Sequence, residues 1–242
     1  MKKIPKRYLI GAAAAPFIFA ACGGSGSSSS APSTANYNFV IPQLNSQRVY
    51  AETIVDDSSN TINLSFTETV TAVNDNGTYQ VLRQDPSNNS ITINGTNYSI
   101  QPVVTTYNGS GQAISSMNNS TKVSCTYAPF GQGVTYPTEI GDSFSGIYNE
   151  TCGTTTIVNT QSGTVASLQS VTVPAGTFQT LLINGSVSFT DTLGIVHGQS
   201  ISTYRDVSTG ALIEYAESDN YSPNPTVGYP TKIAIELVSK TP

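Results

Sequence analysis

The stretch KIAIELV, residues 232–238, shows the pattern that decides the fold class. Its aliphatic side chains Ile233, Ile235 and Leu237 occupy alternate positions, with smaller or charged residues between them. Successive side chains of a β-strand point to opposite faces, so this alternation places the three aliphatic side chains on one face. The stretch therefore predicts a half-buried β-strand that closes the domain.

Similar runs, rich in Val, Ile, Thr and Tyr, recur along the chain and are separated by clusters of Gly, Asn, Asp and Pro. Residues 61–73 and 78–83 flank NDNG at 74–77, whose Asn-Gly pair tolerates positive φ and favours a hairpin. Further runs span residues 90–93, 98–104, 180–183, 186–190, 199–204 and 211–217. Helix signals are nearly absent. We predict an all-β antiparallel meander sheet, arranged as a half-open barrel or a sandwich.

Two further Asn-Gly pairs, at residues 94–95 and 184–185, are candidate turns. Asn94-Gly95 joins residues 90–93 to residues 98–104 as a second hairpin. At Asn184-Gly185 the chain either turns back or continues as a bulged strand into Val187. The sequence leaves this second choice open.

The first 21 residues read as a secretory signal peptide. Four basic residues precede an uncharged stretch from Leu9 to Ala21, and its 13 residues are too few for the roughly 20 of a membrane-spanning helix. The stretch ends in Phe19-Ala20-Ala21 before Cys22, which resembles the lipobox of bacterial lipoproteins, although that family usually has Leu where Phe19 stands. The resemblance implies cleavage before Cys22 and attachment of diacylglycerol and palmitate to that cysteine.

The residues after Cys22 define the expected organisation. Residues 22–36 are mostly Gly, Ser and other small residues, so we expect a flexible tether, followed by a single β-rich domain over residues 37–242. Loss of the signal removes four of the 10 basic residues and none of the 15 acidic ones, giving a net charge of about −9. This charge argues against nucleic acid as a partner.

Two cysteines remain once Cys22 is lipidated. Cys125 and Cys152 form an even pair in a chain destined for an oxidising compartment, so we expect one disulfide between them. A closed loop of roughly 28 residues would stabilise the fold by about 3.5 kcal/mol. The alternative is a pair of buried free thiols.

The sequence offers little for catalysis. GDSFSG, residues 141–146, contains the Gly-Asp-Ser of an esterase and lipase superfamily, but His197 is the one histidine and no Asp stands three residues before it. We expect His197 to be a solvated loop residue. No complete zinc or calcium pattern is present, so we predict no catalytic residue, no metal and no cofactor.

The second half of the chain carries a longer resemblance. VTVPAGTF, residues 171–178, resembles a Val-Pro-Ala-Gly-Thr-Phe signature of bacterial envelope proteins, in which it joins two β-strands. The structural positions that it implies are Val173, Pro174, Gly176 and Phe178, together with an upstream element at Pro137, Gly141 and Phe144. Arg205 stands where the downstream strand of those proteins usually has tryptophan. The resemblance covers residues 136–217 and implies a half-open barrel around an apolar groove.

These features together predict a membrane-anchored lipoprotein of the bacterial cell envelope, held by lipid on Cys22. The resemblance favours the outer membrane if the host is Gram-negative. We expect a non-catalytic binding or scaffolding domain, for an apolar or lipid-like envelope ligand if it binds one. The alternatives are a surface-displayed adhesin and, less favoured, a hydrolase of the envelope.

Overall fold

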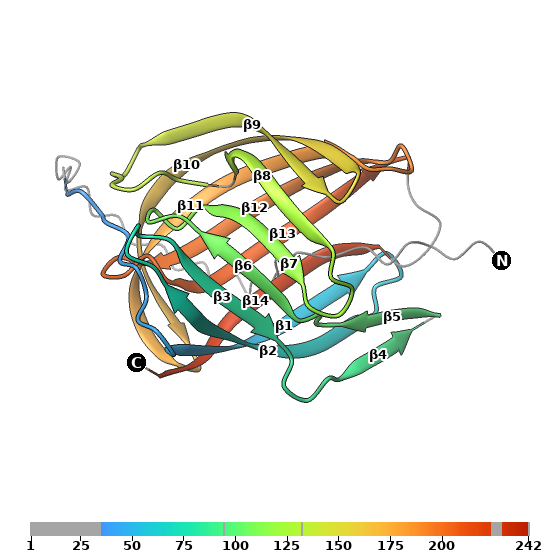
Figure 1. The fold of residues 1–242 in the computed structure, drawn as a ribbon, viewed down its shortest axis with the longest axis horizontal. Helices are drawn as coiled ribbons and strands as arrows, with labels where there is room; N and C mark the ends of the chain where they lie inside the picture. The colour runs from blue at the N-terminus through green and yellow to red at the C-terminus, as the bar shows by residue number, and fades with distance from the viewer. Residues whose placement is uncertain (1–34, 94, 132, 224–228, 242) are drawn as a thin grey trace, which may run out of the picture.

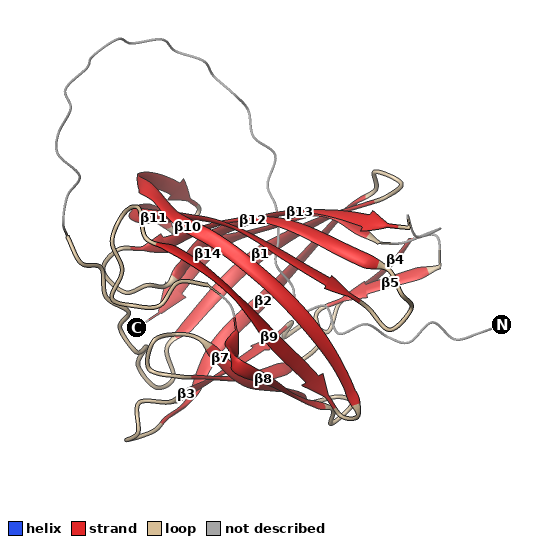
Figure 2. Ribbon diagram, turned by 90° about the horizontal axis from the view of Figure 1, so that it is seen from above, coloured by secondary structure: helices blue, strands red, loops and turns tan. Residues whose placement is uncertain are grey.

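A computed structural model of the chain describes residues 35–93, 95–131, 133–223 and 229–241. In these residues the structure consists of β-strands and loops (Figures 1 and 2). The strands are β1 (Gln47–Asp56), β2 (Thr61–Val73), β3 (Tyr79–Gln84), β4 (Ser90–Ile93), β5 (Thr96–Ser99), β6 (Val103–Tyr107), β7 (Ala113–Asn118), β8 (Ser124–Gly131), β9 (Ser143–Cys152), β10 (Thr155–Val173), β11 (Gly176–Thr190), β12 (Val196–Asp206), β13 (Leu212–Ser222) and β14 (Pro230–Thr241). The signal peptide, Cys22 and the tether up to residue 34 lie outside the described residues, as does Asn94 of the second predicted hairpin.

Twelve of the strands form one closed barrel, and β4 and β5 pair only with each other. Neighbours in the barrel follow the order of the chain and are antiparallel, so the predicted all-β antiparallel meander is confirmed. The predicted half-open barrel or sandwich is wrong. β1, which the sequence did not reveal as a strand, pairs with β14 on one side and with β2 on the other, and this closes the barrel.

The clearest alternating pattern of the sequence, in residues 232–238, lies in a strand of the barrel. Ile233, Ile235 and Leu237 of β14 are buried in the largest apolar cluster that the described residues form. Tyr50 and Phe66, from β1 and β2, stack within the same cluster with ring centroids 5.1 Å apart. The open choice at residues 184–185 is resolved as well. β11 runs on through Gly176–Thr190, and the bulge lies opposite, in β10 between Val165 and Ser167.

One end of the barrel is covered by the residues that precede β1, which we call the N-terminal strap (residues 37–46). Tyr37 exchanges two backbone hydrogen bonds with Thr138, at 2.8 and 2.9 Å, and Val40 donates to the carbonyl of Thr209. The strap lies at the left of Figure 1, beside the turn between β2 and β3. We call this the strap end, and the opposite end, near the β4–β5 hairpin, the far end.

The β4–β5 hairpin packs against the barrel without joining its sheet. Tyr98 is buried in the apolar cluster, and Ile91, Ile93 and Ile100 pack against that cluster. Within the residues that the structure describes, no helix is long and apolar enough to cross a membrane.

Candidate functional site

The candidate site is a group of polar and aromatic side chains on the inner wall of the barrel. β12 and β13 supply most of it, because their ladder aligns Gln199 with Asp219 and His197 with Tyr221. Glu217, one register position away on the same face, is among the most buried charged residues, at 5% exposure. The strand register thus gathers acidic, amide, imidazole and phenol groups on one surface.

Glu217 is held by two hydrogen bonds. The Gln199 amide donates to Oε1 at 2.8 Å, and the Tyr215 hydroxyl donates to Oε2 at 2.5 Å. Burial, reinforced by the nearby charge of Asp219, raises the pKa of Glu217 to about 8. The side chain is therefore largely protonated at neutral pH, and it serves as a hydrogen-bonding group more than as a charge.

Asp219 lies two residues further along the same strand as Glu217. Burial raises the pKa of its carboxyl group. The Tyr221 hydroxyl lies within hydrogen-bond distance of both Asp219 Oδ2 and the Pro230 carbonyl. A phenol has one hydrogen to donate, so when it donates to Pro230 the contact with Asp219 requires a proton on the carboxyl group.

His197 occupies the far end of this surface, and its predicted place in a solvated loop is wrong. β12 begins at Val196, so His197 belongs to the strand and is 6% exposed. Its ring stacks on Phe189 with centroids 4.3 Å apart, and its Nε2 lies 3.0 Å from Asp191 Oδ2. Since Asp191 Oδ1 accepts two backbone hydrogen bonds of its own turn, the carboxylate links the imidazole to the β11–β12 turn.

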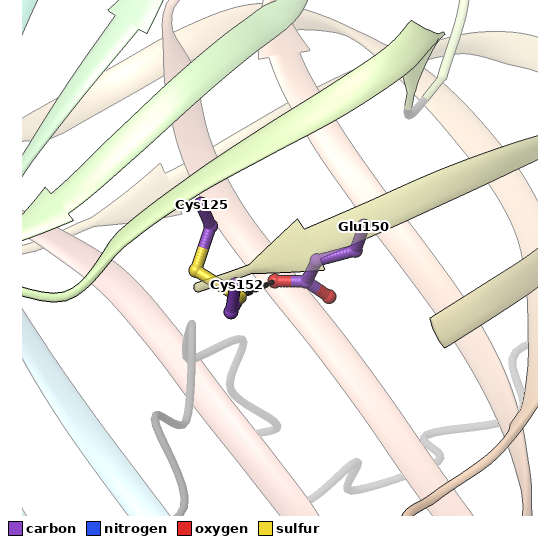
Figure 3. Close-up of side chains that lie close together, drawn as sticks. All are labelled: Cys125, Glu150 and Cys152. Carbon is purple, nitrogen blue, oxygen red and sulfur yellow. Dashed lines mark hydrogen bonds between the residues drawn. A yellow bond between two sulfur atoms is a disulfide. The ribbon is translucent and has the colours of Figure 1, made fainter. Parts of the chain in front are cut away.

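The disulfide lies on the strands β8 and β9 (Figure 3). Cys125 and Cys152 are direct ladder partners with Cα atoms 4.1 Å apart, and the structure joins them in a disulfide. Glu150 Oε1 lies 3.7 Å from Cys152 Sγ. A disulfide sulfur has no hydrogen, so this contact is a hydrogen bond only when protonated Glu150 donates it, and burial does raise the pKa of Glu150.

The same three residues form the candidate metal group of the described structure. The nearest ligand atoms of Cys125, Glu150 and Cys152 lie within 4.8 Å of one another. Thiolate, not disulfide sulfur, is the form in which cysteine binds metals. With the disulfide closed, the group offers a metal one carboxyl group only.

The upstream element of the envelope-protein resemblance forms a local unit at the strap end. Gly141 has φ of +98°, and Phe144 packs against Gly163, where an added Cβ would lie 2.4 Å from the ring. The Asp142 carboxylate accepts hydrogen bonds from Thr138 Oγ1 and the Glu139 amide. Asp142, Ser143 and Phe144 line a pocket of about 200 Å³ beside this turn. Pro137 is the residue of a cis peptide bond in the same loop.

The Val-Pro-Ala-Gly-Thr-Phe stretch forms a tight hairpin at a separate place. Val173 pairs with Gly176, so Pro174 and Ala175 are the two turn residues between β10 and β11. Gly176 has φ of +125°, which an L-residue rarely adopts. The Ala175 amide donates to the Leu237 carbonyl of β14, and Val173 is buried. Phe178 is half-buried, with the Lys240 ammonium 4.8 Å from its ring centroid.

The residues of the Gly-Asp-Ser motif and the histidine do not share a site. Ser143 is the first residue of β9, at the strap end, and it is exposed. His197 pairs with Phe189, which pairs with Asn159 and through it with Tyr148, at the other half of β9.

The sequence matches no family model and no curated protein. Among solved structures, a candidate exported protein with YmcC-like fold from Bacteroides fragilis is similar, with a TM-score of 0.51 at 10% identity over 86% of this chain and 100% of that one. A candidate lipoprotein of Parabacteroides distasonis has a TM-score of 0.47 at 12% identity, covering 85% of this chain and 99% of its own. The hypothetical lipoprotein YmcC of Escherichia coli has a TM-score of 0.43 at 7% identity, covering 81% and 85%. The Bacteroides structure shows that this chain has a YmcC-like fold.

Proposed function

We propose that this protein is a lipid-anchored lipoprotein of the bacterial envelope, whose barrel binds an amphiphilic, lipid-like ligand on its inner wall and performs no chemistry on it. The observation that carries the proposal is the uneven character of that wall. An apolar arc on β14, β1 and β2 is continuous with a polar arc on β12 and β13.

The apolar arc suits an acyl chain. Ile54, Ile62, Leu64, Ile233 and Ile235 belong to one buried cluster on these three strands. These side chains are at most 8% exposed, so an acyl chain would have to part this cluster to contact them. Each Å² of hydrocarbon that it then buried would contribute about 25 cal/mol. The largely neutral Glu217 and its partners Gln199 and Tyr215 would meet the uncharged polar part of the ligand.

The absence of chemistry is supported by the placement of the nucleophile candidate. A serine hydrolase needs its base within hydrogen-bond reach of the serine. Ser143 and His197 lie on different strands and are not aligned with each other across the sheet, and His197 is hydrogen-bonded to Asp191. Loss of a fluorophosphonate reaction in Ser143→Ala would contradict this part of the proposal.

The anchor is supported by the lipobox-like residues before Cys22, and it has a direct test. Radiolabelled palmitate should enter the wild type and not Cys22→Ala, and only the wild type should sediment with membranes. Cys125→Ala/Cys152→Ala is the matched control, because it removes cysteines without touching the lipobox. Label in Cys22→Ala would overturn the lipoprotein assignment.

The ligand is tested by native mass spectrometry of the full lipoprotein extracted from its host in a neutral detergent. We expect an added mass that is released by organic solvent and has the composition of an amphiphile. A spectrum with the lipidated polypeptide alone, at detergent concentrations that preserve other lipid complexes, would contradict the binding role.

A further inference from the structure

Every arginine that follows Cys22 lies on the inner face of the barrel. The three are Arg48 on β1, Arg83 on β3 and Arg205 on β12. Arg83 has a buried partner, because its guanidinium lies 2.8 Å from Glu52 Oε2. For a chain with few basic residues, this inward placement is a marked departure from the usual exposure of arginine.

Arg48 and Arg205 lack such a partner. Within the described part of the chain neither forms an ion pair, although Glu68 stands opposite Arg48 in the β1–β2 ladder. Arg205 donates one hydrogen bond, from Nη1 to the Gly210 carbonyl at 3.0 Å. Both guanidinium groups therefore keep donors that no carboxylate occupies.

The two arginines belong to one region of the inner wall. Arg205 pairs with Leu212 in the β12–β13 ladder, and the Tyr50 hydroxyl of β1 donates to the carbonyl of that same Leu212. Burial raises the pKa of Tyr50, and the charges that act on its hydroxyl include Glu68, Arg48 and Arg205. Tyr50, two residues from Arg48 on β1, thus reaches the backbone of the residue that pairs with Arg205.

Three more tyrosines surround this region from other elements. Tyr79 and Tyr107 stack with centroids 5.1 Å apart, and Tyr136 enters from the β8–β9 loop. Burial raises the pKa of all three, to about 12 for Tyr107, while the positive charge of Arg205 lowers each. The Tyr136 hydroxyl is buried and has no hydrogen-bond partner among the described residues.

We propose that Arg48 and Arg205, with the hydroxyl of Tyr136, form a binding site for a phosphate oxyanion at the strap end of the barrel. Arg48 and Arg205 carry two positive charges and Glu68 carries one negative charge, so this partly buried place has an excess of one positive charge. An oxyanion would neutralise it and accept the unused donors, and arginine is well suited to phosphate because its donors form a planar fork. The proposed donors come from three separate elements, β1, β12 and the β8–β9 loop.

The N-terminal strap covers this site. The Phe39 ring lies 5.9 Å from Tyr79 and 5.8 Å from Tyr136 between centroids. Gly210, whose carbonyl Arg205 holds, leaves room for the same ring, since a Cβ there would lie 2.6 Å from it. Access to the oxyanion site therefore runs past Phe39, and Phe39→Ala should speed association without removing any proposed ligand group.

This inference rests on the proposed binding function, because it names the charged part of the ligand. The source of the phosphate is separated by two probes. The full lipoprotein in dodecyl maltoside is titrated calorimetrically with inorganic phosphate and, separately, with dihexanoyl phosphatidic acid. Binding of both probes indicates a free-anion site. Binding of the lipid alone indicates that the apolar arc contributes, as the proposed function requires.

Arg48→Gln and Arg205→Gln test the assignment of the residues. We expect each to weaken binding of the probe by about tenfold or more, the usual effect of losing a charge-assisted contact. Lys232→Gln is the matched control, because it makes the same charge change at an exposed position of β14. Equal losses in Lys232→Gln, or no binding of either probe by the wild type, would overturn the site. If native mass spectrometry then still finds an amphiphile without phosphate, the proposed function survives and only the oxyanion site is lost.

Discussion

The most direct consequence of the buried acid group concerns Glu217→Gln. Glutamine keeps the size of the side chain, and its amide oxygen can accept from Gln199 while its NH2 group donates to the Tyr215 oxygen, but it cannot ionise. With a pKa of about 8 against an ordinary value of 4.5, folded wild-type protein retains the Glu217 proton over a range in which unfolded protein has lost it. The unfolded state then binds fewer protons, so the free energy of unfolding falls as the pH rises from 4.5 to 8.

The size of this effect follows from the shift. At about 1.4 kcal/mol per pKa unit, Glu217 alone accounts for a loss of up to about 5 kcal/mol between these pH values. The stabilising contribution is complete below pH 4.5 and gone above pH 8. Glu217→Gln should therefore match the wild type near pH 5 and exceed it near pH 8. For a domain of this length, each kcal/mol corresponds to about 2–4 °C in Tm.

Urea unfolding at half-unit steps from pH 5 to pH 8.5 measures how steeply the free energy of unfolding changes with pH. The groups that act on Glu217 are Tyr215 and Asp219 on its own strand and Gln199 on β12, and His197 acts on Asp219. Asp219 should therefore leave a smaller residual pH dependence in the variant. Asp75→Asn, in the exposed β2–β3 turn, is the control and should keep the wild-type slope. A Glu217→Gln slope equal to that of the wild type would refute the reasoning.

Two further predictions concern the fold. Reduction of the disulfide should lower Tm, since closing a loop between residues 27 positions apart contributes about 3.5 kcal/mol. Denatured unreduced protein should show no titratable thiol from Cys125 or Cys152, and two thiols per chain would contradict this. Phe178→Ala should lower the free energy of unfolding by about 1–3 kcal/mol, less than the 3–5 kcal/mol of a fully buried ring, because the ring is half-exposed. Leu168→Ala, at an exposed position of β10, is the control and should cost little. Equal losses of stability in both variants would contradict a packing role for Phe178.

The hairpins and the carboxyl-terminal strand could be predicted because their signals are local. Residues 61–73, 74–77 and 78–83 contain both strands and the turn between them, and the structure places β2 and β3 there. Barrel closure is a different problem. Tyr50 pairs with Leu237 and Phe66, so β1 depends on a partner at the other end of the chain, and no local pattern specifies that pairing.

The polar residues of the inner wall could not be predicted from the sequence, for a related reason. β13 was recognised only as far as Glu217, although it runs to Ser222, because its inward positions continue with Asp219 and Tyr221 instead of aliphatic residues. β1 was missed likewise, since Arg48 and Glu52 occupy inward positions among its apolar ones. The alternation that reveals a half-buried strand assumes an apolar interior, and it fails where a barrel lines its interior with polar groups.

The same wall connects the proposed anchor with the proposed oxyanion site. Among the described residues, Tyr37 is the first with a backbone partner, Thr138, and it follows Cys22 by 15 residues, a length that reaches at most about 50 Å even when fully extended. Lipid on Cys22 would therefore keep Tyr37, at the strap end, within that distance of the membrane. Arg48, Arg205 and the Phe39 ring that covers them all lie at the strap end. A tether of this length would hold the end that carries the proposed oxyanion site close to the bilayer, so a phosphate-bearing amphiphile from that bilayer could enter there.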